Sequence, residues 1–175
     1  YDGATGPRFL TLVGGFDSSV AAAADPKVYR LDLTRTSAGW TEQPPMAAGR
    51  AHLNATFLAD GALMAVGGGS GVGNPGGQYV GPVFTAEMRG ADGTWRTVPG
   101  QTVRRTYHST SLMLPDGRLV SAGDDKDGAI RPMEIYSPPY LSQGPRPSIT
   151  WAPANVADGD AFTVDTPQAA TVTHV

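Results

Sequence analysis

The sequence has no cysteine, few charged residues and no long apolar run, and each lack excludes a class of protein. Without cysteine, neither a disulfide nor a thiolate metal site can form within the chain. No apolar segment is long enough to predict a helix that spans a bilayer. Charged residues make up 17% of the chain, its net charge is -3, and no basic block is present, which argues against a nucleic-acid partner.

Glycine and proline are abundant instead, with 23 and 15 copies among 175 residues. Together they exceed a fifth of the chain, which disfavours long helices and favours many short strands joined by turns. The hydrophobic content of 40% is enough to form a core. The composition therefore predicts an all-β protein.

The most informative stretch runs from residue 104 to residue 123. A polar entry is followed by an alternating segment, the turn Pro115-Asp116-Gly117 and a second apolar segment, which together predict a β-hairpin. At the start of the hairpin lie Tyr107 and His108, an adjacent phenol and imidazole whose side chains could both bind a metal.

The same pattern occurs earlier in the chain, which predicts a repeat. His52 precedes His108 by 56 residues, and the Asp-Gly turn at 60–61 precedes the one at 116–117 by the same number. A partial earlier copy covers residues 7–15 and ends, like residues 62–69, on consecutive glycines.

Each repeat continues with a variable loop and a third strand, expected at 28–33, 83–88 and 132–136. In two repeats a fourth strand follows that contains Trp40 or Trp95, which we expect to pack inside the repeat. Four short strands per unit with Gly-Gly after the second are typical of kelch blades in a β-propeller, where glycines fit the crowded axis.

Four prolines between residues 138 and 147 predict a linker, because proline cannot sustain a paired ladder. Beyond it, segments 148–151 and 160–165 alternate like strands around a turn at 156–159, and another strand is expected from Thr171. We therefore expect propeller blades over 1–142 and the start of a truncated immunoglobulin-like sandwich over 143–175, with Trp151 packed at its beginning.

The chain begins without the pattern of a signal peptide and ends in what looks like the middle of a strand, so we expect a piece of a longer protein. About two and a half blades would leave strand edges unpaired. We expect another chain or a further segment to supply the missing blades.

Four motifs together resemble the copper radical oxidases, galactose oxidase and glyoxal oxidase. They are Tyr-His-Ser at 107–109, Leu-Pro-Asp-Gly at 114–117, Glu-Ile-Tyr-Ser-Pro-Pro-Tyr-Leu at 134–141 and Arg-Pro-Ser-Ile-Thr at 146–150. The resemblance covers residues 1–175. It implies the end of a seven-bladed kelch propeller and the beginning of an immunoglobulin-like domain in a secreted or cell-surface protein.

The resemblance also implies a copper site and its chemistry. Tyr107 would be the axial copper ligand and catalytic base, and His108 an equatorial ligand. The radical tyrosine, its cysteine and the second histidine would lie outside this chain, since His174 is too early in the strand pattern. The implied reaction oxidises a primary alcohol or an aldehyde with O₂ and gives hydrogen peroxide.

Strand geometry sets a condition on this site. Neighbouring residues on a strand point to opposite faces, so Tyr107 and His108 could bind one metal only where the strand bends or begins. Cu(II) favours imidazole and anionic oxygen donors, so Tyr107 would have to lose or share its proton.

Other polar residues have simpler interpretations. His52 occupies the position of His108 in the earlier repeat and is expected to be structural. Arg104 and Arg105 are expected to be a solvated loop pair, and residues 124–128 a polar turn that lacks the glutamate of a calcium loop. Ser109 and Ser111 have no residues of a catalytic triad around them.

Two alternatives to the oxidase remain at this point. One is a non-catalytic kelch module that binds carbohydrate or protein, and the other is a purely structural cell-surface propeller. The cysteine and tyrosine upstream and a histidine downstream in the full-length protein would favour the oxidase.

Overall fold

The computed structural model describes residues 8–16, 22–73, 78–125 and 128–172, and these residues form an all-β structure. The chain divides into two compact units between Pro138 and Pro139, four residues before the boundary expected from the sequence. Throughout the described residues, no helix has the length and apolar character needed to cross a membrane.

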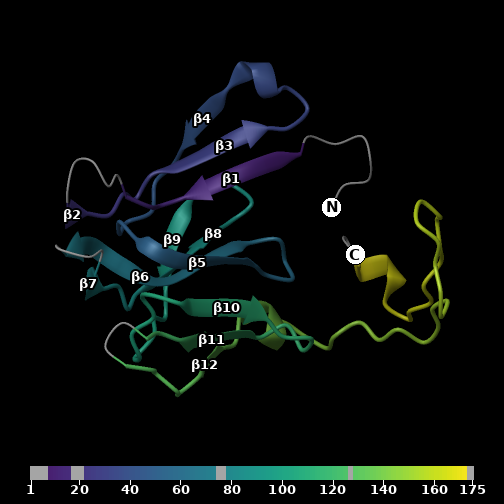
Figure 1. Ribbon diagram of the computed structural model, residues 1–175. Coiled ribbons are helices and arrows are strands. Elements are labelled where there is room, and N and C mark those ends of the chain that lie inside the picture. The colour runs from purple at the N-terminus through teal and green to yellow at the C-terminus, as the bar shows by residue number, and fades with distance from the viewer. Residues whose placement is uncertain (1–7, 17–21, 74–77, 126–127, 173–175) are drawn as a thin grey trace. The chain divides into compact units, whose positions relative to one another are not determined.

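The first unit contains three antiparallel sheets that follow one another along the chain (Figure 1). The first sheet has the order β1 (Phe9–Val13), β3 (Val28–Asp32) and β4 (Trp40–Gln43). The second is built on β5 (Ala51–Phe57), β6 (Leu63–Gly73), β8 (Ala86–Arg89) and β9 (Trp95–Val98). The third has the order β10 (Ser109–Met113), β11 (Leu119–Gly123) and β12 (Glu134–Tyr136).

This order confirms the strand pattern of the repeat. In both complete hairpins an Asp-Gly turn joins the strands, with Phe57 opposite Leu63 and Met113 opposite Leu119. The turns close through equivalent hydrogen bonds, in which Gly61 N donates to Leu58 O at 3.0 Å and Gly117 N to Leu114 O at 2.8 Å. The turn chemistry therefore fixes the register of each hairpin.

The segments expected as variable loops contain additional strands. β6 extends to Gly73 and pairs with β7 (Gln78–Pro82), while β2 (Ala22–Ala23) joins the other side of β6. The second sheet thus has a longer β6 and two more strands than the sequence pattern predicted.

Consecutive glycines let neighbouring sheets approach closely, as the sequence predicted. Gly15 N donates to Arg50 O at 2.8 Å, and Gly68 N donates to Arg105 O at 2.7 Å. Gly14 and Gly67 have φ of 64° and 66°, and a Cβ on either would collide with the carbonyl oxygen of that same arginine. Only glycine satisfies both the left-handed backbone and the close contact.

Polar side chains add a second connection, between β5 and β10, which lie side by side (Figure 1). Asn54 Nδ2 donates to Ser109 Oγ at 2.9 Å, and the hydroxyls of Thr56 and Ser111 are 2.6 Å apart. The two serines therefore hold neighbouring sheets together, which agrees with the absence of a catalytic triad in the sequence.

The two tryptophans of the repeat differ in their surroundings. Trp95 packs against a buried cluster of Val28, Met46 and Ala65, as expected. Trp40, in contrast, is 44% exposed at the edge strand of the first sheet, so the prediction that it packs inside its repeat was wrong. No further strand of the described residues pairs with β4 to cover it.

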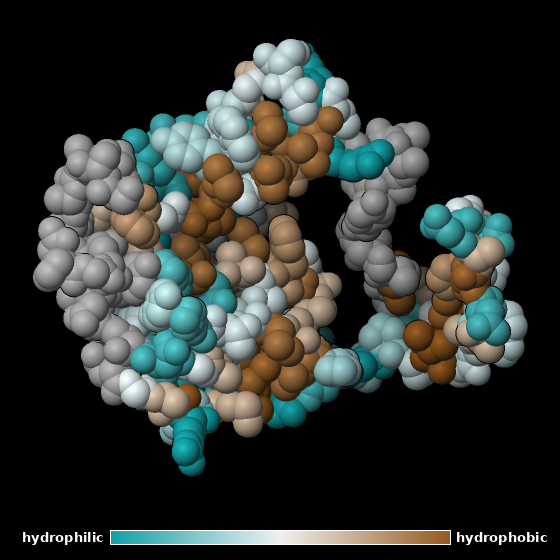
Figure 2. All heavy atoms as spheres, viewed as in Figure 1, coloured by the Kyte–Doolittle hydropathy of each residue, from teal (hydrophilic) through white to brown (hydrophobic). Residues whose placement is uncertain are grey.

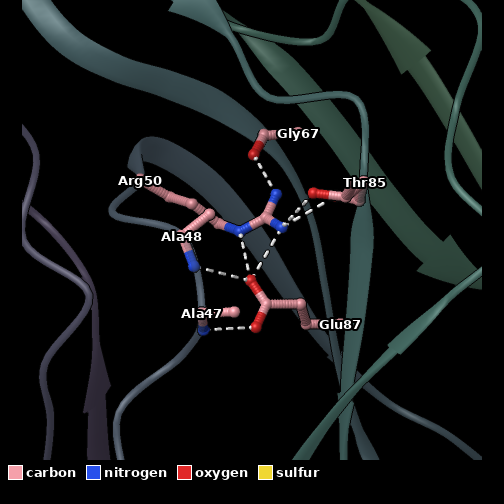
Figure 3. Close-up of polar contacts among 6 residues, drawn as sticks. All are labelled: Ala47, Ala48, Arg50, Gly67, Thr85 and Glu87. Atoms are coloured by element: carbon pink, nitrogen blue, oxygen red, sulfur yellow. Dashed lines mark hydrogen bonds and ion pairs between the residues drawn. The ribbon is translucent and has the colours of Figure 1, made fainter.

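A fully buried ion pair joins the start of β5 to β8 (Figure 3). Arg50 Nη2 lies 2.9 Å from Glu87 Oε1, and the arginine also donates to the carbonyl oxygens of Gly67 at 2.8 Å and Thr85 at 2.7 Å. Glu87 accepts hydrogen bonds from the backbone N–H groups of Ala47 and Ala48. Burial lowers the pKa of Arg50, and the carboxylate of Glu87 opposes this shift.

The third sheet repeats this arrangement and corrects an expectation. Arg105 is 1% exposed, with hydrogen bonds of 2.8 Å to Gly123 O and 2.6 Å to Pro132 O. Glu134 lies 3.7 Å from it and accepts the backbone N–H of Thr102. Arg105 is therefore an internal anchor of the sheet, and the prediction of a solvated loop residue was wrong.

The second unit has little regular structure. The expected strands at 148–151 and 160–165 are reduced to one bridge between Trp151 and Asp165. Trp151 is 55% exposed, so the prediction that it packs into a core was wrong. A turn closes from Asp160 N to Ala157 O, close to the expected position. Residues 169–171 form a 3₁₀ helix, and most of the strand expected from Thr171 to Val175, with His174, lies outside the described residues.

Replacement of Gly67 by alanine should destabilise the protein more than replacement of Gly61. Both glycines have positive φ, so each change costs about 1–2 kcal/mol of unfolding free energy. A Cβ on Gly61 meets no atom within 4 Å, whereas one on Gly67 meets Arg105, which adds about 1–3 kcal/mol. Urea unfolding measures both, and equal losses would contradict the close contact between the sheets.

Glu87→Gln should lower the unfolding free energy by about 3–5 kcal/mol, because Arg50 would remain buried without its charged partner. Glu42→Gln is the matched control, since Glu42 lies exposed on β4 and its change should cost less than about 0.5 kcal/mol. Chemical denaturation of both variants provides the comparison. A Glu87 variant as stable as the control would show that the ion pair does not support the fold.

Candidate functional site

The Tyr107–His108 pair lies directly between the buried Arg105 and the first residue of β10, Ser109. His108 has a φ of 56°, in the left-handed region that non-glycine residues seldom adopt. The backbone therefore bends at His108, before the alternation of the strand begins. Strand alternation would otherwise point the two side chains to opposite faces, so this bend is what the sequence required for them to meet.

The two rings do lie together. Their centroids are 3.6 Å apart, and the ring planes are inclined by 29° in a stacked arrangement. Tyr107 is half-buried against Ala24 and Ala51, whereas the side chain of His108 is 59% exposed. A phenol and an imidazole are thus held side by side, with the imidazole open to solvent.

A carboxylate orients the imidazole. His108 Nδ1 lies 3.0 Å from Asp125 Oδ2, and Asp125 N donates to Tyr107 O at 3.2 Å. A proton shared between Nδ1 and the carboxylate leaves Nε2 as the ring nitrogen able to bind a metal, the arrangement usual for histidine ligands. The sequence pattern predicted only a polar turn at Asp125 and gave no signal for this role.

His52 is the third ring of the cluster. Its centroid is 5.3 Å from that of Tyr107, and its φ is also 56°. The pKa of His52 is lowered, first by burial and then by the nearby charge of His108. The repeat predicted equivalent positions for His52 and His108, but it did not predict that His52 would lie beside Tyr107.

Asp124 supports the backbone in front of the pair. It is 2% exposed, and its Oδ2 accepts hydrogen bonds from Thr106 N at 2.6 Å and Thr106 Oγ1 at 2.7 Å. Arg104, whose side chain is 25% exposed, places its Nε 3.6 Å from the same oxygen. Asp124 therefore points into the protein, so the prediction that it belongs to a polar turn was wrong, while residues 126 and 127 of that turn lie outside the described residues.

The chain supplies only part of a possible metal site. Within the described residues, no three His, Cys, Asp or Glu side chains gather where they could hold a metal ion. The donors at hand are the phenol oxygen of Tyr107 and Nε2 of His108, a set that suits copper better than calcium or magnesium. Arg104 and Arg105 do not contribute donors, because guanidinium groups have no lone pair to offer.

No protein-family model matches the sequence. A WSC domain-containing protein from the fungus Arthroderma benhamiae is 37% identical over 68 residues, which are 36% of this chain and 7% of that protein.

Among solved structures, a fungal alcohol oxidase of the AA5 family in complex with copper matches with a TM-score of 0.73. The match covers 91% of this chain and 36% of the oxidase at 22% identity, so it shows a shared fold. The chain therefore spans little more than a third of the oxidase and a small fraction of the WSC protein.

Asp124→Asn should lower the unfolding free energy by about 1.5–3 kcal/mol, because Thr106 would lose its charged acceptor in a buried site. Asp116→Asn provides the control, since Asp116 also accepts a backbone N–H, that of Arg118, but lies half-exposed in a turn. Thermal and urea unfolding would compare the two variants. Equal stability of both would mean that the contact between Asp124 and Thr106 does not hold the backbone.

Proposed function

We propose that this chain is a piece of a copper radical oxidase and carries two copper ligands, Tyr107 and His108. The observation that carries the proposal is the stacking of these two rings at a backbone bend, with centroids 3.6 Å apart. The shared fold with a copper-bound fungal alcohol oxidase supports it. In this proposal residues 1–142 are kelch propeller blades, and residues 143–175 begin an immunoglobulin-like domain.

The donor set fits copper. Imidazole nitrogen and phenolate oxygen are ligands that Cu(II) accepts. Asp125 on Nδ1 of His108 is the outer carboxylate that commonly orients a histidine ligand. The solvent exposure of His108 leaves space for ligands that come from another part of the protein.

The proposed reaction takes two electrons and two protons from a primary alcohol or an aldehyde hydrate and transfers them to O₂. The products are an aldehyde or an acid and hydrogen peroxide, so atoms and electrons balance. Copper, together with a Tyr-Cys radical cofactor expected outside this chain, would supply the redox chemistry. Tyr107 Oη would accept the hydroxyl proton of the substrate, and Asp125 would keep His108 in the tautomer with a free Nε2.

Exposed apolar side chains on the two outer sheets support the proposal that further blades are needed. They lie over β1 and β10 (Figure 2), and they include Leu10, Leu12 and Leu112. A closed propeller would cover such faces with its next blade. A segment or chain outside residues 1–175 would supply those blades, and the complete protein would act at the cell surface or outside the cell.

The recurrence of the bend favours a second candidate function. His52 and His108 both have φ of 56°, so this backbone conformation belongs to the repeat and does not by itself require a metal. A kelch module that binds carbohydrate or protein without copper would also keep these histidines. Copper binding separates the two functions.

Copper titration of the full-length protein tests the proposal. Tyr107→Phe and His108→Ala should each weaken copper binding, and Asp125→Asn should weaken it by about 10–100-fold because the orientation of His108 is lost. Tyr29→Phe, which removes a half-buried phenol from β3, should leave the affinity unchanged. Calorimetry and the absorption of a phenolate–copper band would report the binding.

Unchanged copper affinity in both Tyr107→Phe and His108→Ala would remove these residues from the site. A full-length protein that binds no copper would favour the non-catalytic module. Copper binding with a phenolate band that disappears in Tyr107→Phe would instead support the oxidase.

A further inference from the structure

Two arginines share a cavity of about 320 Å³ between the first and second sheets. Arg30 comes from β3 and Arg89 from the end of β8. The cavity lies at the turn end of β5, next to Phe57, whereas His52 lies at the opposite end of this strand. Five residues of strand separate these ends by about 17 Å, so the cavity is distinct from the site at Tyr107.

Among the described residues, no anionic side chain fully neutralises the positive charges of these two guanidinium groups. The Nε atoms of both Arg30 and Arg89 are buried, and neither has a hydrogen-bond acceptor within the described part of the chain. Arg89 Nη2 has a long hydrogen bond of 3.4 Å to Gln43 Oε1. Two arginines of like charge therefore line one cavity, and each has a buried Nε donor without an acceptor, an unfavourable arrangement that an anion between the guanidinium groups would relieve.

Electrostatics agree with this geometry. The pKa of Arg89 is lowered, first by burial and then by the charge of Arg30, while Asp92 opposes the shift. Asp92 is the smallest of these three influences on Arg89, and its carboxylate oxygens accept hydrogen bonds from Thr94 N and Thr94 Oγ1. An anion between the arginines would remove their mutual repulsion.

Aromatic and aliphatic side chains form part of the remaining walls. The guanidinium of Arg30 lies over the ring of Phe9, 3.6 Å from its centroid, which holds the charge in place through a cation–π contact. Phe57 and Leu63 also line the cavity, and Phe57 is 66% exposed. An aromatic or aliphatic body of a ligand would cover this ring from water.

We propose that this cavity binds a small carboxylate with an aromatic body, its carboxylate between Arg30 and Arg89 and its ring against Phe9 and Phe57. The carboxylate offers two oxygens, enough to accept from both guanidinium groups. The volume of about 320 Å³ is near the lower limit of ligand pockets, which restricts the ligand to about the size of a substituted benzoate.

Benzoate is the probe, and calorimetry with the full-length protein measures its binding. Arg30→Gln and Arg89→Gln should each weaken binding by about 10-fold or more, because each replaces a charged donor by a shorter, neutral amide. Arg35→Gln is the matched control. Arg35 is an exposed arginine of the same sheet region, so its change removes the same charge away from the cavity and should leave the affinity unaltered.

Two ligand comparisons test the chemistry. Benzamide, which is neutral and has nearly the same shape, should bind at least about 10-fold more weakly than benzoate. Phe57→Ala should weaken benzoate more than it weakens acetate, since acetate has no ring. Inorganic sulfate that binds as tightly as benzoate would overturn the assignment of an aromatic ligand.

The thermal stability of the free protein distinguishes a binding pair from a structural pair. If the two arginines form an anion-binding pair, Arg89→Gln removes the repulsion between their charges. The melting temperature of this variant without ligand should then equal or exceed that of the wild type. Benzoate should then raise the melting temperature of the wild type and of Arg35→Gln, but not that of Arg89→Gln. A large loss of stability in free Arg89→Gln, or equal stabilisation of all three proteins by benzoate, would overturn the proposal.

Discussion

The hydrogen bonds of a buried arginine at the entrance of the second and of the third sheet are the interactions on which the rest of the first unit depends. Arg50 and Arg105 each donate to a glycine carbonyl of the second strand and to a carbonyl just before the third strand. The main-chain carbonyl of the same arginine accepts a glycine N–H from the preceding sheet. One residue thus connects two strands of its own sheet and also the neighbouring sheet.

The glutamates make these buried charges tolerable. A guanidinium taken out of water loses hydration that only a charged, well-aligned partner can replace. Glu87 provides this partner for Arg50, and it also satisfies the backbone N–H groups of the loop that enters the sheet. Glu87 therefore holds the entering loop, the start of β5 and β8 together. The residues that follow Arg50 are positioned as a consequence.

Local patterns were sufficient to predict the strands but not these anchors. The Asp-Gly turns and the alternation after His52 and His108 specify hairpins from neighbouring residues alone. Arg50 and Glu87 are 37 positions apart, and a charged residue in a loop normally predicts a solvated surface. Arg50 and Arg105 recur at an offset of 55, which was a usable signal. Their glutamates, Glu87 and Glu134, recur at an offset of 47 because the intervening loops differ in length, so the sequence repeat does not reveal the ion pairs.

In the second unit, the sequence pattern predicted strands at 148–151 and 160–165 that the structure does not form. Alternation around Trp151 predicted paired strands, but alternation only forms a sheet when neighbouring strands can bury one face. Within the described residues, Trp151 pairs with Asp165 through a single bridge and remains exposed. Local pattern alone therefore did not determine strand formation there.

The spacing between the arginine and the histidine differs between the two repeats. Two positions separate Arg50 from His52, but three separate Arg105 from His108, so the third sheet contains one additional residue before the bend. Asp124 stands where the second repeat has Gly68, and its carboxylate binds the backbone N–H of Thr106 in the lengthened segment. Because His52 and His108 share the same φ, the bend itself is unchanged. The third sheet thus differs in two ways on a bend that the repeat already provides: Asp124 holds the lengthened segment at Thr106, and the phenol of Tyr107 stands beside the imidazole where the second repeat has Ala51.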